Sequence, residues 1–472
     1  MSQVRSNDSF LTSVESRLFF EGIDTTALAR EYGTPLFVVS EPRLVQNIER
    51  LKRIGDVIPF DLKICYAAKA MSVIGVLRAV SETGIDIEVN SGGELWKALK
   101  AGFRGSQIIF NGTSKEVWEL ELAITNEIYA IQADSLFELS LIDETATRLG
   151  KRANVSLRMV PEIESSTLSG LQTALLTSKF GMMPDEAMSA IEKYRGSDHL
   201  AIGGIHLHIG SQNPDPRVYT EALTTLFRFI GNAAKTHGVK LSHANIGGGF
   251  PVDYLKEGSQ QYIDEDQAEM LHSHFEPADA MRAAWESVKT DDSALSDDIL
   301  AGLTLLIEPG RSVIADTTIC LTTVRNVKER PIVNSDLSDK VSETDHWLLT
   351  DAGFNLLLSM ETYKWYYHLI SATRCNEAHD HKYKVAGPLC DGGDVYFDIE
   401  GNDRLPEHRL LPADVRPGEV LALLNCGAYS LSQASQYNGR PLPPVVLIQK
   451  DGSAKLIRRR DDLDDLVNND IF

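Results

Sequence analysis

Three short apolar segments, separated by roughly 20 residues, decide the fold of this chain. Residues 64–69 read ICYAAK, residues 85–89 read IDIEV and residues 108–111 read IIFN. Amphipathic stretches lie between them, and Gly84 and Gly102 stand where a helix would end on a glycine. Continuous apolar strands that alternate with helices are typical of a parallel sheet whose two faces are both buried.

The same alternation extends over a much longer part of the chain. It predicts an eight-stranded β/α barrel over residues 36–314, with an open, doubly wound sheet as the alternative. The further apolar runs are Leu36–Val39, Ile128–Ala133, Val155–Val160, Ile202–Ile209, Ala244–Ile246 and Leu303–Ile307.

The pattern changes after Ile314. Segments separated by Pro, Gly and Asp predict a mainly β domain over residues 315–472, to which we expect residues 1–35 to contribute. Residues 256–298, rich in Asp, Glu and Gln, predict a helical insertion with an acidic, solvated surface, whose role is open. The strand-like segments are Ile319–Val324, His346–Leu349, Val420–Leu424 and Val445–Gln449.

The composition disfavours several classes of protein. The chain of 472 residues carries a net charge of -21, which disfavours nucleic acids and anionic membranes as partners. No apolar run approaches the roughly 20 residues that cross a bilayer, and residues 1–12 lack the apolar core of a secretory signal, so we expect a soluble, cytoplasmic protein. Five scattered cysteines without a CxxC pair argue against a disulfide framework and a cysteine zinc site.

Lys69 is the first candidate catalytic residue, because it stands at the end of an apolar strand. A buried ammonium group is costly unless it is paired, so such a lysine loses its proton readily and can act as an imine-forming nucleophile. The alternative is a lysine whose ammonium group extends past the strand into solvent.

Glycine clusters recur at predicted strand ends, where backbone N–H groups can approach an anion. Gly247 to Gly249 and Arg311 follow late strands, which is where β/α barrels bind phosphate. Glu308 could pair with a protonated pyridine nitrogen, or it could form an ordinary ion pair with Arg311. The clusters are Ser91-Gly92-Gly93-Glu94, Gly247-Gly248-Gly249 and Glu308-Pro309-Gly310-Arg311.

Two further groups of residues could carry chemistry. His206 and His208 alternate along one predicted strand, so their side chains point to the same face, and no third ligand with metal-site spacing accompanies them. In the second domain, Cys390 and Asp391 place a thiol and a carboxylate side by side in a glycine-rich turn. Spacing alone leaves this segment as a turn.

Together these segments resemble the fold-type III pyridoxal-phosphate decarboxylases, which include diaminopimelate and ornithine decarboxylases. The resemblance extends from about Phe20 to Phe472 and is closest to the bacterial D-ornithine/D-lysine decarboxylase group, with which the chain shares Phe20–Asp24 and Leu456–Arg459. The matching motifs, in order, are Tyr66–Lys69, Ser178–Gly181, His208–Gln212, Gly247–Gly249, Glu308–Arg311 and Cys390-Asp391.

The resemblance implies a role for each candidate residue. It implies that Lys69 bonds pyridoxal phosphate, that His208 stacks on the ring and that Glu308 pairs with the pyridinium. It implies that Cys390, from the partner subunit of a head-to-tail homodimer, returns a proton to the α-carbon, and that Asp391 binds the far ammonium group of the substrate. The remaining residues that it assigns to the cofactor are Glu88, Ser211, Gly247, Gly248, Gly249, Gly310, Arg311 and Tyr429, of which Arg311 and Tyr429 also contact the substrate.

Two departures from the family bear on the site. Glu88 stands where the family usually has aspartate. Residues Asp351–Asn355 begin as in diaminopimelate decarboxylases, but Leu356–Glu361 follows where those enzymes carry an Arg-Pro pair that binds the distal carboxylate. Loss of that donor predicts a substrate with a plain distal ammonium group, D-ornithine or D-lysine, whose handedness rests on the resemblance.

Four alternatives remain open. A diaminopimelate decarboxylase would need Arg374 or Lys364 to replace the missing arginine. A siderophore-pathway decarboxylase would act on a modified diamino acid. An alanine-racemase-like enzyme would need a tyrosine where this chain has Cys390. Outside the enzymes, the chain could be a binding protein of the antizyme-inhibitor type.

Overall fold

The computed structural model describes residues 10–161, 163, 167, 175, 177–256, 259, 263–273, 275–290, 300–332, 344–402 and 404–471. The chain divides into two compact units. The barrel unit comprises Val45–Val252 and Ser273–Val313, and the β unit comprises Met1–Leu44, Asp253–His272 and Ile314–Phe472. None of the described helices has the length and apolarity needed to cross a membrane.

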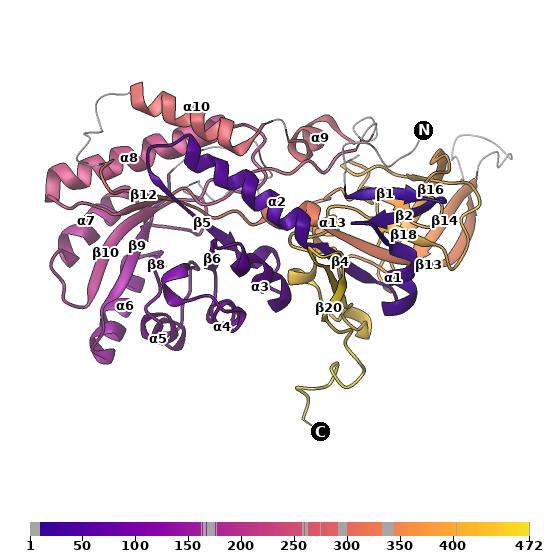
Figure 1. Ribbon diagram of the computed structural model, residues 1–472, viewed down its shortest axis with the longest axis horizontal. Helices are drawn as coiled ribbons and strands as arrows, with labels where there is room; N and C mark the ends of the chain where they lie inside the picture. Colours follow the sequence, from indigo (N-terminus) through magenta and orange to yellow (C-terminus); the bar gives the residue numbers. More distant parts are fainter. Residues whose placement is uncertain are drawn as a thin grey trace. The chain divides into compact units, whose positions relative to one another are not determined.

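The barrel unit contains a closed barrel of eight parallel strands (Figure 1). The strands follow one another around the barrel in chain order, and β12 pairs with β5 to close it, with Thr304 opposite Asp61. The barrel prediction is confirmed, and the open-sheet alternative is wrong. The strands are β5 (Asp61–Ala67), β6 (Asp86–Val89), β7 (Ile108–Phe110), β8 (Ala130–Ala133), β9 (Ala153–Arg158), β10 (Leu200–His206), β11 (His243–Asn245) and β12 (Thr304–Ile307).

Local sequence fixes the ends of the helices that connect these strands. The Ser91 and Ser135 side chains accept hydrogen bonds from the Glu94 and Glu138 backbone N–H groups and so cap two helices. Gly102 ends one helix with a φ of 106°, a left-handed conformation that favours glycine. The helices are α2 (Glu41–Lys52), α3 (Ile74–Glu82), α4 (Gly92–Ala101), α5 (Val117–Thr125), α6 (Leu136–Leu149), α7 (Pro184–Tyr194), α8 (Arg217–His237), α10 (Pro277–Thr290) and α12 (Arg311–Ile314).

The β unit is built on a nine-stranded sheet with a separate three-stranded sheet, β1-β2-β3. The long strand β13 pairs with β4, β14 and β18, and all four strands predicted after Ile314 are confirmed. The elements are β1 (Leu11–Val14), β2 (Arg17–Phe20), β3 (Ile23–Asp24), α1 (Thr25–Tyr32), β4 (Leu36–Ser40), α9 (Glu265–Leu271), β13 (Thr318–Pro331), β14 (Thr344–Thr350), α13 (Leu358–Thr362), β15 (Leu369–Ser371), β16 (His381–Ala386), β17 (Arg409–Leu411), β18 (Val420–Leu423), β19 (Val445–Ile448) and β20 (Ala454–Arg458).

One predicted barrel strand belongs to the other unit. Leu36–Val39 lies in β4, between β13 and β19 in the sheet of the β unit. All five residues of β4 are buried. A continuous apolar run predicts a strand buried on both faces, and it does not distinguish a barrel from a covered sheet.

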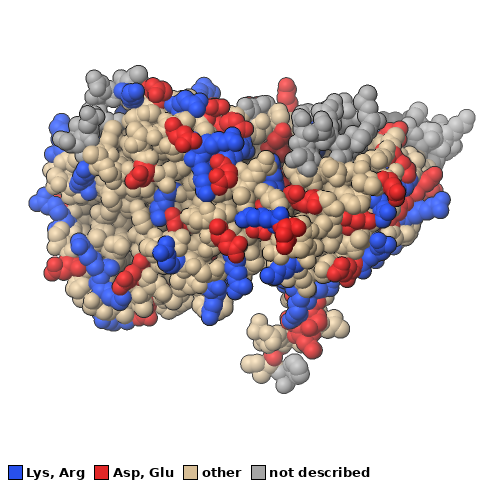
Figure 2. Space-filling view, viewed as in Figure 1, with Lys and Arg blue, Asp and Glu red and all other residues tan. Residues whose placement is uncertain are grey.

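The predicted insertion at residues 256–298 is helical, but part of it is packed into the protein core and is not exposed to solvent as predicted. It supplies α9 to the β unit and α10 to the barrel unit, where Trp285 packs edge-on against Phe60 at 5.0 Å and lies 6.1 Å from Phe227. Residues 257–258, 260–262, 274 and 291–298 of this segment lie outside the described residues. Figure 2 shows acidic and basic side chains interspersed on the visible face, without a large area of one sign.

Candidate active site

Lys69 lies at the carboxyl end of β5, in a short helical turn at Ala68–Ala70. The Tyr66 hydroxyl donates to the Met71 carbonyl at 3.1 Å and ties this turn to the strand. The Lys69 Nζ lies 3.9 Å from Glu88 Oε2, and the Glu88 side chain is completely buried. The ammonium group therefore faces a carboxylate inside the barrel, where a change in its charge is felt strongly.

Two buried carboxylates share amide donors in the barrel interior. Asn111 Nδ2 donates to Glu88 Oε1 at 2.9 Å and to Glu308 Oε1 at 3.0 Å. Asn245 Nδ2 donates to Glu308 Oε1 at 2.7 Å. One Glu308 oxygen therefore accepts two amide hydrogen bonds, while Oε2 is held by Asn111 at 3.1 Å and retains the capacity to accept another donor.

Burial raises the pKa of Glu308 to about 7, and the negative charge of Glu88 adds to this effect. Lys69 and the two amide hydrogen bonds act in the opposite direction. A cationic N–H group facing Glu308 would be stabilised in this setting, because it would supply the charge that the interior lacks. A protonated pyridine nitrogen has this property.

The two histidines of β10 and its extension are held in the uncharged form. Burial lowers the pKa of both His206 and His208 well below the usual range. His206 Nε2 lies 3.7 Å from Glu308 Oε2. The Gly248 N–H donates to His208 Nδ1 at 3.2 Å, which fixes the His208 ring beside the glycine run. A neutral, fixed imidazole ring is suited to stacking on a planar cofactor.

The glycine run forms a cradle into which side chains could not fit. Gly247 and Gly249 have φ values of 68° and 97°. A Cβ atom on Gly247 would collide with His208, and one on Gly248 would collide with the Glu308 carbonyl. A glycine run that follows a late strand is the arrangement that binds phosphate in this type of barrel.

Arg311 completes the anion-binding side of the site. It follows Gly310 at the start of α12, and its Nε donates to Ser211 Oγ at 3.3 Å. The side chain is almost fully buried, and a guanidinium group is suited to a phosphate dianion. Glycine cradle, arginine, fixed histidine and buried carboxylates together fit pyridoxal phosphate. The structure thus brings together all the predicted barrel residues: Lys69, Glu88, His208, Ser211, Gly247, Gly248, Gly249, Glu308, Gly310 and Arg311.

Three polar residues of the barrel were not singled out from the sequence. Asn111 and Asn245 bind Glu308, and the buried Arg158 lies over the Phe180 ring at 4.2 Å and 3.9 Å from Asp134 Oδ1. All three stand at or just after the carboxyl ends of β7, β11 and β9. Since barrel active sites form at these ends, the position of a polar residue there was a usable signal.

The turn that carries Cys390 and Asp391 is rigidly built within the β unit. The Cys390 N–H donates to Asn438 Oδ1 at 2.7 Å, and Asp391 Oδ2 accepts from the Tyr437 hydroxyl at 3.2 Å. Cys390 is exposed, whereas the other four cysteines are buried. The third predicted residue of this unit, Tyr429, has a φ of 58°. An exposed thiol on a fixed turn is available for proton transfer.

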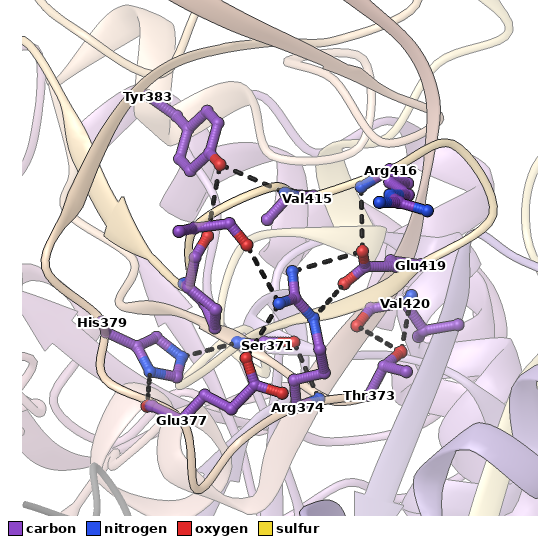
Figure 3. A network of polar contacts seen from close by, with 12 residues as sticks. Ser371, Thr373, Arg374, Glu377, His379, Tyr383, Val415, Arg416, Glu419 and Val420 are labelled. Atoms are coloured by element: carbon purple, nitrogen blue, oxygen red, sulfur yellow. Dashed lines mark hydrogen bonds and ion pairs between the residues drawn. The ribbon is translucent and has the colours of Figure 1, made fainter.

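Arg374, one of the two residues that could replace the missing arginine, is engaged elsewhere. Its guanidinium group donates to Glu419 at 2.9 Å, to Glu377 at 2.8 Å and to the Ala413 carbonyl at 3.0 Å (Figure 3). Binding a substrate carboxylate would break this network. The other residue, Lys364, is buried and pairs with Glu361 at 3.0 Å.

Comparison with known proteins places the chain in a family. Residues 44–315 match the pyridoxal-binding domain of the pyridoxal-dependent decarboxylases. The chain belongs to this family. It is 32% identical to the diaminopimelate decarboxylase of Methanocaldococcus jannaschii, over 97% of this chain and 95% of that protein. It is 31% identical to the Bacillus subtilis diaminopimelate decarboxylase, over 95% and 94% of the two chains.

Solved structures agree with this assignment. The M. jannaschii diaminopimelate decarboxylase in complex with L-lysine has a TM-score of 0.81 and 31% identity, and the match covers 100% of this chain and 99% of that one. A lysine/ornithine decarboxylase from Vibrio vulnificus, with a TM-score of 0.68 and 20% identity, shares the fold. The protein is thus a pyridoxal-phosphate-dependent amino acid decarboxylase with the alanine-racemase-like fold. The non-enzyme alternative is wrong, and these relatives do not support the narrower D-ornithine/D-lysine group.

The first prediction concerns Lys69. Replacing it with alanine should abolish covalent attachment of pyridoxal phosphate, because the amine that would bond the cofactor aldehyde is then missing. Borohydride reduction followed by mass spectrometry measures the attachment. Lys97→Ala is the control, since Lys97 lies on the outer helix α4 and donates to Ser72 Oγ. Labelling of Lys69→Ala at the wild-type level would contradict the assignment.

The second prediction uses the raised pKa of Glu308. In the cofactor-free protein the folded state keeps this proton up to a pH of about 7, whereas the ordinary value is 4.5. Stability relative to Glu308→Gln should therefore decrease by roughly 3 kcal/mol as the pH rises through this window, and should be constant above it. Thermal unfolding of both proteins across this range measures the difference, and identical slopes would contradict the prediction.

Proposed function

We propose that this enzyme releases CO2 from the α-carbon of a diamino acid, with meso-diaminopimelate as the first candidate substrate. The observation that carries this proposal is the similarity, at 30% identity or more over nearly the full chain, to diaminopimelate decarboxylases from several organisms. The buried ammonium group of Lys364 is a candidate partner for the distal carboxylate. To bind that carboxylate, the ammonium group of Lys364 would have to break its ion pair with Glu361.

D-Ornithine or D-lysine is the second candidate. Leu356–Glu361 stands where diaminopimelate decarboxylases have the Arg-Pro pair, and Arg374 is bound to Glu419 and Glu377. A distal carboxylate left without a cationic partner costs several kcal/mol on burial. This observation favours a substrate whose far end carries only an ammonium group facing Asp391.

The residues of the chain divide the work of the proposed reaction. When bound, pyridoxal phosphate supplies the ring that accepts the electrons left on the α-carbon as CO2 departs. Lys69 would offer its amine for covalent attachment, and Glu308 would pair with the ring nitrogen and favour its protonated form. Arg311 and the glycine run would hold the phosphate. The thiol of Cys390 donates the proton that replaces the carboxyl group.

We also propose that Cys390 acts in the active site of a second subunit, within a homodimer. Three helices that follow one another in the barrel unit, α4, α5 and α6, carry large exposed apolar side chains. Such a patch is uncommon on a monomer and is typical of a subunit interface. The side chains are Trp96, Trp118 and Phe137, with exposed fractions of 52%, 50% and 76%.

Substrate identity is tested by measuring CO2 release from meso-diaminopimelate and from the D- and L-forms of lysine and ornithine. We expect the highest kcat/KM with meso-diaminopimelate. Lys364→Ala should raise KM for diaminopimelate by about tenfold or more and leave that for lysine nearly unchanged, because only the former has a distal carboxylate. Turnover of D-ornithine or D-lysine without turnover of diaminopimelate would establish the second candidate instead.

The shared site is tested by mixing two inactive variants, Lys69→Ala and Cys390→Ala. If subunits exchange at random, half of the dimers are mixed and each contains one intact site, so about a quarter of the wild-type activity should return. Labelled subunits report the exchange independently. Exchange without any recovery of activity would show that Cys390 serves its own chain.

A further inference from the structure

A cavity of about 460 Å³ opens within the β unit. Its volume is typical of sites that bind small molecules. Three arginines, Arg325, Arg440 and Arg460, line it together with a single carboxylate, Asp351, and the amide of Asn355. None of these residues belongs to the cofactor site of the barrel unit.

The carboxylate in the cavity wall balances only one of the three arginines. Asp351 Oδ1 accepts from the Thr322 hydroxyl at 2.8 Å and from the Thr323 N–H at 2.9 Å. Asp351 Oδ2 accepts from Arg325 Nη2 at 2.6 Å and from the Thr34 hydroxyl at 2.7 Å. With both oxygens engaged, Asp351 neutralises Arg325 and has little capacity for a second guanidinium group.

Arg440 and Arg460 are held by backbone carbonyls. Arg440 Nη2 donates to the Pro388 carbonyl at 2.9 Å, and Arg460 Nη2 donates to the Pro35 carbonyl at 2.9 Å. Among the described residues, neither forms an ion pair with a carboxylate within 4.0 Å, although Asp394, which does not line the cavity, attracts Arg440 electrostatically. Burial lowers the pKa of Arg460, and the charge of Arg325 also disfavours its protonated form, against the attraction of Asp351. The cavity wall thus has an excess of positive charge.

Asn355 adds an unsatisfied polar group to the same wall. Its side chain is only 4% exposed, and its Oδ1 atom has no hydrogen-bond partner in the described structure. Its Nδ2 atom makes one long hydrogen bond, 3.4 Å, to the Ser435 carbonyl. A buried amide in this state costs free energy. Its second N–H group can donate to a bound anion, whereas Oδ1 can be satisfied only by a ligand with an O–H donor, such as hydrogen phosphate.

We propose that this cavity binds a small oxyanion, carried by a phosphate or carboxylate compound, between Arg440 and Arg460. Guanidinium groups recognise both chemistries through paired N–H donors. An oxyanion would supply the negative charge that Asp351 cannot provide for Arg440 and Arg460. The second N–H group of Asn355 Nδ2 would donate a hydrogen bond to the anion.

The proposed site is connected to the turn that carries Cys390. Arg440 holds the carbonyl of Pro388, two positions before Cys390, and Asn438, two positions before Arg440, accepts the hydrogen bond from the Cys390 N–H. An anion that binds Arg440 therefore competes with the hydrogen bond from Arg440 to the Pro388 carbonyl, which helps to fix this turn. The resulting change in turnover rests on the proposed role of Cys390, whereas anion binding itself does not.

The test uses the cofactor-loaded enzyme, in which the phosphate cradle of the barrel is already filled. Isothermal titration with inorganic phosphate and, separately, with malonate is carried out at constant ionic strength set with chloride. We expect saturable binding of about one anion per chain. Arg460→Gln and Arg440→Gln should each weaken it about tenfold or more, from loss of a charged hydrogen bond. Whichever anion binds more tightly identifies the source chemistry.

Arg459→Gln is the matched control, because this neighbouring arginine is exposed and pairs with Asp465. It should bind the anions as the wild type does. Arg440 is exposed, so its variant should fold even where loss of Arg460 disturbs the protein. Absence of saturable binding, or equal weakening in Arg459→Gln, would overturn the site. Tight binding with an unchanged kcat would leave the site standing and overturn its connection to Cys390.

Discussion

The active site depends on the cost of keeping two carboxylates inside a closed barrel. Glu88 and Glu308 are buried, and the amide of Asn111 donates to both. Burial and the charge of Glu88 raise the pKa of Glu308 to about 7, although Lys69 acts in the opposite direction. Lys69 and a protonated cofactor ring relieve the same cost from two sides. The barrel interior does not fully balance the negative charge of Glu88 and Glu308, and a protonated cofactor ring would balance it. This interaction therefore favours binding of the cofactor.

Much of this arrangement could be predicted from the sequence, because the signals are local. Continuous apolar runs predicted the barrel strands, and their carboxyl ends placed Lys69, the glycine run and Arg311 at one mouth. A glycine cluster alone is a weak signal. Once the barrel fold places Gly247 to Gly249 and Arg311 at the same strand ends, the combination indicates a phosphate site. The alternation of His206 and His208 predicted only that they share a face. The family resemblance assigned His208 to the cofactor ring, and its orientation is fixed by the Gly248 N–H.

What the sequence left open depends on contacts between distant segments. An apolar run such as that of β4 is expected both in a barrel strand and in a strand of a covered sheet. Only its pairing with β13 and β19 assigns β4 to the β unit. The sequence did not predict that Asn111 and Asn245 both donate hydrogen bonds to Glu308, because Glu308 lies 197 and 63 positions away from them. Arg374 was a possible substrate ligand until Glu419 and Glu377 were seen to hold it.

The position of β4 has a consequence for biosynthesis. Its partner β19 lies near the other end of the chain, with Val445 opposite Phe37, whereas the barrel is complete once β12 has been made. As the ribosome synthesises the protein, the barrel can close while β4 still lacks a neighbour on either side. This strand, apolar from Leu36 to Val39, must then be shielded from other chains until the last segments emerge.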